Sequence, residues 1–248
     1  MQRYVSELLT HFVGRNLLED QNAQYQLLVK ILKSGWLLSS SKIEIRQEDL
    51  LREATKHIVR YALDLSTIDL NNAFIPDVVC FADIPLADLK VHMQKYSLFG
   101  ISFKKDFLIK KGASPVFYIS SESTDPTEKN TSLEMIFRKE LQNYLDYTRD
   151  FEKTLSPSRP HTSREESVIK FHMFLQKRIL CSLKFWKAST NDSDAENFYL
   201  EREWRLYGGV NFALDDIQRI VLPGVFSRSL RADLPQYNNE VVFSDGSI

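Results

Sequence analysis

The stretch of sequence with the clearest chemical potential is residues 199–205, where two glutamates and an arginine occupy every second position. If this stretch is a β-strand, its alternation places Glu201, Glu203 and Arg205 on one face. Two carboxylates and a guanidinium on one face cost stability unless that face is wet or the charges pair. The pattern therefore leaves two interpretations: an edge strand with a solvated, ion-paired face, or a catalytic carboxylate that its neighbour orients.

The histidines and cysteines predict no metal site. His11 lies between apolar residues near the start of the chain, where a packed ring with a satisfied nitrogen is the usual role. The five histidines form no HxxxH or HExxH pattern and no cluster with acidic residues. Cys80 and Cys181 belong to no CxxC pair, so neither a zinc site nor a disulfide framework is expected.

Common nucleotide-binding and hydrolase motifs are also absent from the sequence. It contains no GxGxxG dinucleotide fingerprint and no phosphate loop of the GxxxxGKS/T type. It contains no GxSxG turn that would present a nucleophilic serine. Any enzymatic activity must therefore come from a site without these motifs.

Composition sets further limits on function. The chain has 248 residues, with 32 Lys and Arg against 33 Asp and Glu, and a formal charge of −1. This balance excludes binding of nucleic acid or anionic membrane by bulk charge, although a local basic patch remains open. No apolar run approaches the roughly 20 residues of a membrane span, and the first residues lack the features of a signal peptide. We therefore expect a cytoplasmic protein with no membrane contact.

The elements that position these residues can be read from the apolar spacing. A spacing of three and four predicts helices over residues 22–32, 47–63, 86–95, 133–155 and 168–186. Apolar runs predict strands over residues 77–84, 98–103, 115–120, 198–207, 217–222 and 241–243. Residues 4–12 form a strand or a short helix, which periodicity does not separate. The order predicts one domain over residues 1–248, with a helical insertion at residues 132–187.

Several segments taken together resemble the abortive-phage-infection family called AbiGi, over nearly the whole chain. They are THF at 10–12, ILKSGWL at 31–37, VCFADIP at 79–85, FGISF at 99–103, PVFY at 115–118 and YLEREWR at 199–205. At the level of fold, the histidine strand, the first helix and the late Glu-x-Glu strand are similar to ADP-ribosyltransferases, including the DarT type that modifies DNA. The resemblance implies an α+β protein in which a split, mixed β-sheet core, with N-terminal helices and a helical insertion, holds NAD in a cleft.

The resemblance also implies roles for individual residues. His11 would bind the adenosine-side ribose and backbone of NAD, Glu203 would be the catalytic carboxylate, and Glu201 would position or deprotonate the acceptor. A carboxylate fits this chemistry because breaking the nicotinamide–ribose bond develops positive charge on the ribose, which a fixed anion stabilises. The further NAD contacts expected are Ser39, Ser40, Ser41, Phe81, Tyr118 and Arg205.

Three functions remain open from the sequence. The first is an effector of phage defence that transfers ADP-ribose from NAD to a macromolecule, with nucleic acid preferred over protein as acceptor and a cognate antitoxin as partner. The second is a non-enzymatic antitoxin or regulator that binds a partner toxin. The third is a metal-dependent phosphodiesterase or nuclease that uses Glu201, Glu203 and Asp83.

Overall fold

The structure is a computed structural model and describes most of the chain. The described residues are 6–39, 78–122, 132–155, 158–187, 189–191 and 197–245. The chain divides into two compact units, the first made of residues 1–40, 78–116 and 192–248, the second of residues 41–77 and 117–191. The helix expected over residues 47–63, together with Ser40 and Ser41, lies outside the described residues.

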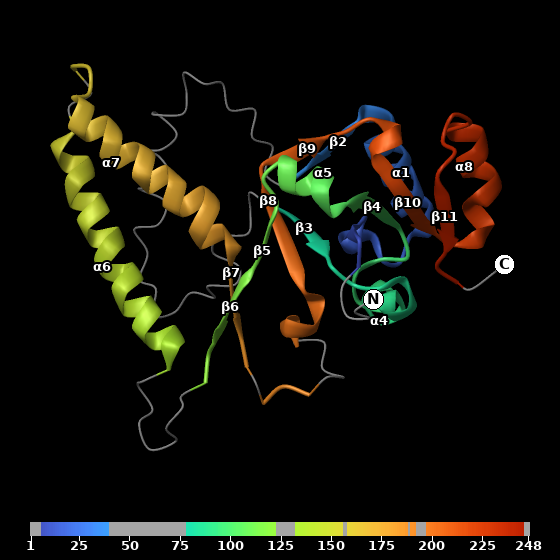
Figure 1. Ribbon diagram of the computed structural model, residues 1–248, viewed down its shortest axis with the longest axis horizontal. Helices are drawn as coiled ribbons and strands as arrows, with labels where there is room; N and C mark the ends of the chain where they lie inside the picture. Colours follow the sequence, from blue (N-terminus) through green and yellow to red (C-terminus); the bar gives the residue numbers. More distant parts are fainter. Residues whose placement is uncertain are drawn as a thin grey trace. The chain divides into compact units, whose positions relative to one another are not determined.

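The first unit is built on a seven-stranded mixed sheet (Figure 1). In spatial order its strands are β11 (Glu240–Phe243), β10 (Ile217–Leu222), β4 (Gly100–Lys104), β1 (Leu8–Phe12), β3 (Val78–Ala82), β8 (Glu203–Tyr207) and β5 (Ser114–Pro115). Neighbouring strands are antiparallel, except β10 and β11, which are parallel. Helices accompany this sheet, so the protein is α+β, as the sequence predicts. The ambiguous first segment is a strand at the centre of the sheet.

The sheet is least continuous between β1 and β3. Strand β1 pairs with β4 along its whole length, from Leu8 opposite Lys104 to Phe12 opposite Gly100. In the described residues, by contrast, β1 and β3 share one register pair, which joins Thr10 to Ala82. A seam with few ladder hydrogen bonds leaves backbone groups that side chains must satisfy. This seam is the part of the sheet closest to the split core expected from the sequence.

One face of the sheet carries the main hydrophobic core. Alternate residues of the central strands point to this face, and they pack against the first helix, α1 (Gln21–Ser34). The side chains at the centre are fully buried: Leu9, Leu28, Ile101, Phe103, Ile217 and Ile220. The spacing of three and four that predicts α1 is therefore the spacing of its buried stripe.

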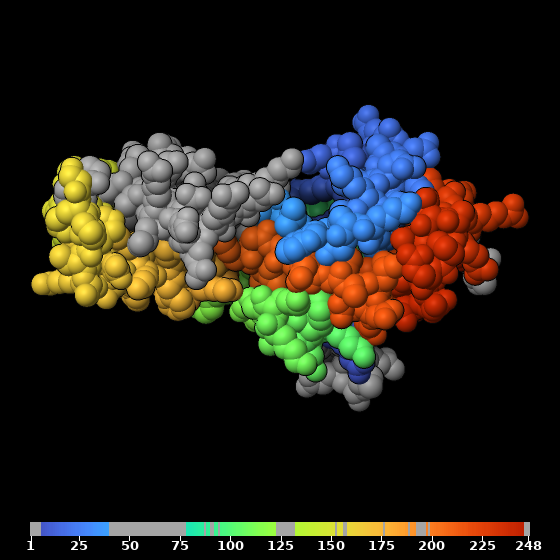
Figure 2. Space-filling view, turned by 90° about the horizontal axis from the view of Figure 1, so that it is seen from above, coloured from blue at the N-terminus to red at the C-terminus, as the bar shows by residue number. Residues whose placement is uncertain are grey.

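Local signals fix both ends of α1. The Asp20 carboxylate accepts a hydrogen bond from the Ala23 amide at 2.9 Å, which caps the helix start. Gly35 ends the helix with φ 66°, a left-handed conformation that favours glycine. The helix also contacts α8 (Ser227–Asp233) near the end of the chain, where the Tyr25 hydroxyl donates to Asp233 at 2.7 Å. In Figure 2 the blue N-terminal segment lies beside the red C-terminal one.

The other face of the sheet is covered near β3 by a short helix, α4 (Leu89–Tyr96). Leu89 of α4 is fully buried and forms a small apolar cluster with Ala82 of β3, next to Phe12 of β1. The last turn of α4 therefore lies on the face opposite the main core.

Three further elements lie outside the main sheet. Helix α5 (Lys105–Lys110) follows β4, and β2 (Trp36–Leu38) pairs with β9 (Gly209–Asn211) in an antiparallel ribbon.

In its described residues, the second unit combines two helices with a pair of strands. Figure 1 shows α6 (Leu133–Thr154) and α7 (Ser163–Phe174) as neighbouring helices, and the ring of Tyr144 stacks on that of His172 between them. Strands β6 (Phe117–Ser120) and β7 (Leu183–Trp186) are parallel. A separate core joins helices and strands: Ile119, Leu141, Leu145, Leu180, Leu183 and Phe185.

The helix expected over residues 168–186 is wrong at its C-terminal end. After α7 the chain passes through a π turn, Leu175–Ile179, and a 3-10 turn, Leu180–Ser182, and then becomes β7. A short apolar run fits a buried helix or a buried strand equally well, and here pairing with β6 decides. The expected helical insertion at residues 132–187 therefore contains a strand.

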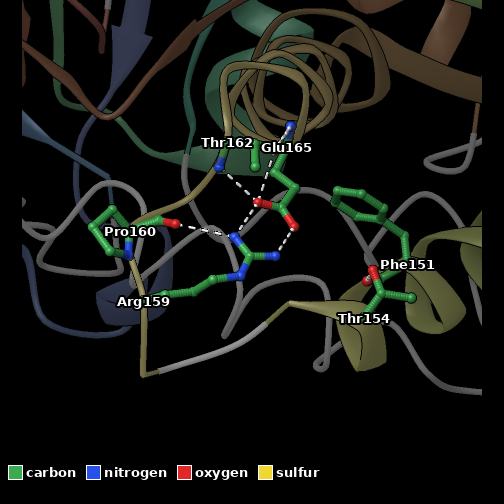
Figure 3. A network of polar contacts seen from close by, with 6 residues as sticks. All are labelled: Phe151, Thr154, Arg159, Pro160, Thr162 and Glu165. Carbon is green, nitrogen blue, oxygen red and sulfur yellow. Dashed lines mark hydrogen bonds and ion pairs between the residues drawn. The ribbon is translucent and has the colours of Figure 1, made fainter.

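The start of α7 is fixed by a local polar network (Figure 3). Thr162 caps the helix by accepting a hydrogen bond from the Glu165 amide, while the Glu165 carboxylate accepts one from the Thr162 amide. Arg159 donates to both carboxylate oxygens of Glu165, at 2.9 and 2.7 Å. This hydrogen bonding to the charged form lowers the pKa of Glu165 to about 2.

Candidate functional site

Residues 199–205 do not form one strand. Phe198–Glu201 is a 3-10 turn, Arg202 adopts a left-handed conformation with φ 45° and ψ 49°, and β8 begins at Glu203. The expectation that Glu201 shares a strand face with Glu203 is therefore wrong, because the left-handed residue interrupts the alternation before the strand starts. Such a conformation costs about 1–2 kcal/mol for a residue with a side chain, so the surrounding contacts must hold the turn in place.

Glu203 and Arg205 form a buried ion pair. They lie two residues apart on one face of β8, and their exposed fractions are 6% and 2%. Arg205 Nε donates to Glu203 Oε1 at 2.7 Å, and Nη2 lies 3.5 Å from Oε2. Strand β8 lies between β3 and β5. The solvated edge strand is therefore the wrong interpretation, although the charges do pair.

Glu201 is also buried, with an exposed fraction of 5%. Its partners come from the last turn of α4: Lys95 Nζ lies 2.6 Å from Glu201 Oε1, and the Tyr96 hydroxyl donates to the same oxygen. Burial and the negative charges of Glu201 and Glu203 raise the pKa of the Tyr96 hydroxyl, which therefore remains a proton donor. Both carboxylates thus act on Tyr96, although Glu201 is not part of the strand.

The ring of Tyr96 is held from two further sides. Phe12 stacks on it with a centroid separation of 6.1 Å, and the Arg15 guanidinium carbon lies 5.0 Å from its centroid. No pattern in the sequence points to Tyr96, Lys95 or Arg15 as site residues. Tyr96 and Glu201 are 105 positions apart, so no local spacing could have connected them.

His11 is positioned by the seam between β1 and β3. Its Nδ1 lies 2.8 Å from the Cys80 carbonyl oxygen. Because a carbonyl only accepts hydrogen bonds, Nδ1 carries the proton and Nε2 of the neutral ring is left as an acceptor. Burial lowers the pKa of His11, and the bond to Cys80 opposes this shift only in part. The ring packs edge-on against Phe81, with centroids 5.9 Å apart.

The strand registers place His11 and Glu203 on opposite faces of the sheet. Thr10 pairs with Ala82, and Ala82 pairs with Glu203, so these three side chains share one face. Alternation along each strand then directs His11 and Phe81 to the other face. The structure therefore brings His11 together with Phe81, and Glu203 together with Arg205. A ligand that touches both pairs must pass through the β1–β3 seam or around the strand ends.

The remaining expected contacts lie elsewhere. Ser39 is buried directly after β2, and its amide donates to the Gly208 carbonyl at 3.0 Å. Tyr118 is half-buried on β6 of the second unit, opposite Lys184 of β7. Ser40 and Ser41 lie outside the described residues. The first unit thus supplies Ser39, Phe81 and Arg205 of the expected set.

No metal-binding group is found in the described ranges. They contain no group of three or more His, Cys, Asp or Glu side chains that could hold a metal ion. Asp83, the third ligand considered for a nuclease, contacts Lys105 Nζ at 2.7 Å and accepts a hydrogen bond from the Ser6 amide. Each of the three carboxylates considered for such a site therefore contacts a cation of the protein.

None of the helices in the described parts of the chain has both the length and the apolar character required to cross a membrane.

The fold and the site define an α+β protein whose mixed sheet carries a buried cluster of carboxylates and cations where β8 begins. A family model described as "Putative abortive phage resistance protein AbiGi, antitoxin" matches residues 49–240, which include α4 and the whole of β8 but not His11. The chain belongs to this family, and the family assigns it to abortive-infection defence. No curated protein and no solved structure matches the chain. The similarity to ADP-ribosyltransferases of the DarT type therefore stays a prediction.

Proposed function

We propose that this protein is an ADP-ribosyltransferase-like effector of abortive-infection defence, and that Glu203 is its catalytic carboxylate. The observation that carries the proposal is the placement of Glu203, which is buried at the first position of β8 and fixed by Arg205. A carboxylate that is held in one orientation before the reaction needs no reorganisation when positive charge develops beside it.

The reaction would break the bond between the nicotinamide nitrogen and the ribose C1′ of NAD. The bonding electron pair leaves with nicotinamide, which becomes neutral, and C1′ develops oxocarbenium character that the Glu203 carboxylate stabilises. The acceptor nucleophile then bonds to C1′ and gives up its proton, for which Glu201 is the nearby base. Glu201 supports this assignment because it is buried and lies within reach of Tyr96, on which both carboxylates act.

His11 would bind the adenosine-side ribose. Its proton sits on Nδ1, so Nε2 is free of a proton and suits a ribose hydroxyl as donor. Because His11 and Glu203 lie on opposite sheet faces, the dinucleotide would have to pass through the β1–β3 seam, where one register pair joins the strands, or around the strand ends. Ser39, Phe81 and Arg205 remain candidate NAD contacts of this unit.

Nucleic acid is the proposed acceptor, because the enzymes to which the fold-level resemblance points include the DarT type. The formal charge of −1 means that such an acceptor would be held by local contacts and not by bulk charge. A mass shift of one ADP-ribose on a DNA or RNA oligonucleotide would support this acceptor. The same shift on protein, with none on nucleic acid, would replace it.

The proposal is tested by nicotinamide release from NAD. We expect the purified protein to release nicotinamide, and Glu203→Gln to lower the rate about 100-fold or more, because the stabilising charge is lost. The matched control is Asp83→Asn, which neutralises an equally buried carboxylate that also pairs with a cation. Circular dichroism establishes that both variants are folded. A wild-type protein that leaves NAD intact, with nucleic acid or protein present, would overturn the proposal.

A second function is favoured by the family description, which names an antitoxin. In that case the protein binds a toxin, and the cluster at β8 is structural. Expression in cells separates the two functions. Toxicity of the wild-type chain that Glu203→Gln relieves supports the effector. A harmless chain that protects cells from a co-expressed toxin, equally well as wild type and as Glu203→Gln, supports the antitoxin.

A further inference from the structure

The last turn of α4 lies against Glu201. Glu201 ends a 3-10 turn and precedes the left-handed Arg202, so it lies outside the strand that carries Glu203. Its Oε1 instead receives the Tyr96 hydroxyl and lies 2.6 Å from Lys95 Nζ. The orientation of this carboxylate therefore depends on a helix that is more than 100 positions away in sequence.

We propose that Tyr96, with Lys95, is a positioning residue that holds Glu201 in place to take the proton of the incoming nucleophile. This inference rests on the proposed ADP-ribosyltransferase function and adds a residue pair to its site. Two donors on one carboxylate oxygen restrict the rotation of the side chain, and hydrogen bonds from charged or polar donors to a buried carboxylate are strong. Glu203 has a different ion-pair partner, Arg205.

Tyr96 is suited to this role because its own position is fixed. Phe12 stacks on its ring, Arg15 lies over the ring at 5.0 Å, and His92 of the same helix stacks at 6.4 Å. The raised pKa keeps the hydroxyl protonated, so that it donates to Glu201 and does not compete for the proton. The hydroxyl is thus held at Glu201 by contacts from β1, from the turn after it and from α4.

The test measures nicotinamide release from NAD, with water as the acceptor. We expect Tyr96→Phe to lower kcat about tenfold, because a misplaced group loses part of its catalytic advantage, and to leave KM for NAD within about twofold. Lys95→Met should also lower kcat. The matched control is Tyr25→Phe, which removes another hydroxyl that donates to a carboxylate, Asp233, at 2.7 Å. This control should turn over NAD at the wild-type rate.

A double-mutant cycle separates positioning from a general structural effect. If Tyr96 acts through Glu201, then Tyr96→Phe has no further effect on kcat in a Glu201→Gln background. An equal loss in both backgrounds, or wild-type kcat for Tyr96→Phe, would overturn this inference while the proposed function stands. A wild-type protein that releases no nicotinamide overturns both.

Discussion

At the scale of single residues, a change in the Glu203–Arg205 ion pair would affect both catalysis and stability, and a test must separate these two effects. Both side chains are almost completely removed from water, so their attraction does little more than offset the desolvation of the two charges. Removing one partner of a buried ion pair takes away the opposite charge, which typically costs 3–5 kcal/mol, whereas Gln retains a hydrogen-bond acceptor for Arg205. Glu203→Gln therefore separates catalysis from stability better than Glu203→Ala does.

The pKa shift of His11 predicts a pH-dependent stability. Its folded pKa lies below the unfolded value of about 6.5, so below that pH the unfolded chain binds more protons. The neutral ring makes its full contribution to the free energy of unfolding above about pH 6.5. This contribution is lost as the pH falls toward the pKa of the folded state. Glutamine at this position still offers a donor for the Cys80 carbonyl. In urea titrations we expect the free energy of unfolding to fall less from pH 7 to pH 5.5 in His11→Gln than in the wild type.

When the free energy of unfolding is plotted against pH, the slope attributable to His11 cannot exceed about 1.4 kcal/mol per pH unit, which corresponds to one proton. The shift of His92, which is also lowered mainly by burial, is present in both proteins and cancels in the comparison. Identical pH profiles for His11→Gln and wild type would show that the ring titrates normally in the folded protein.

The residue types of the candidate site could be predicted from sequence, but the partners of Glu201 could not. Alternation singled out Glu201, Glu203 and Arg205, and the pairing of Glu203 with Arg205 follows from their spacing on one strand. Tyr96 and Lys95 carry no signal in their own neighbourhood, because their partner comes from the far end of the first unit. Such contacts depend on the tertiary arrangement of α4 against the 3-10 turn that precedes β8.

At the scale of elements, the turn at Arg202 predicts a test of how Glu201 is placed. Arg202→Gly should fold normally, because glycine adopts the left-handed conformation without strain. Arg202→Val should lower the free energy of unfolding by about 1–2 kcal/mol, since a β-branched residue is a strong outlier there. Chemical denaturation measures both. Equal stability of the two variants would mean that residue 202 does not hold this conformation.

Elements with a clear period were predicted well, and short apolar runs were not. The stripe of Tyr25, Leu28 and Leu32 matches α1, and Gly35 marks its end. Residues 115–120 were expected as one strand, yet Ser114–Pro115 pairs with β8 of the main sheet while Phe117–Ser120 pairs with β7. A run of this length does not specify its partner, and pairing with different strands divides it at Val116.

At the scale of the whole molecule, the main hydrophobic cores of the two units share no residue among those that the structure describes. We therefore expect Leu145→Ala, in the core of the second unit, to reduce hydrogen-exchange protection of amides in α6, β6 and β7. A buried Leu→Ala change costs about 2–5 kcal/mol, which is large enough to resolve. Amides of β4 and β10 should keep their protection. Uniform loss throughout the chain would show that the cores unfold as one.

Strand β5 ends the main sheet with only two residues, and the second is Pro115. Proline has no amide hydrogen, so this border offers an incoming chain a template that is both short and poor in donors. Self-association by strand addition is therefore discouraged at this border. At this side of the sheet, the covalent structure of one residue therefore works against the growth of fibres.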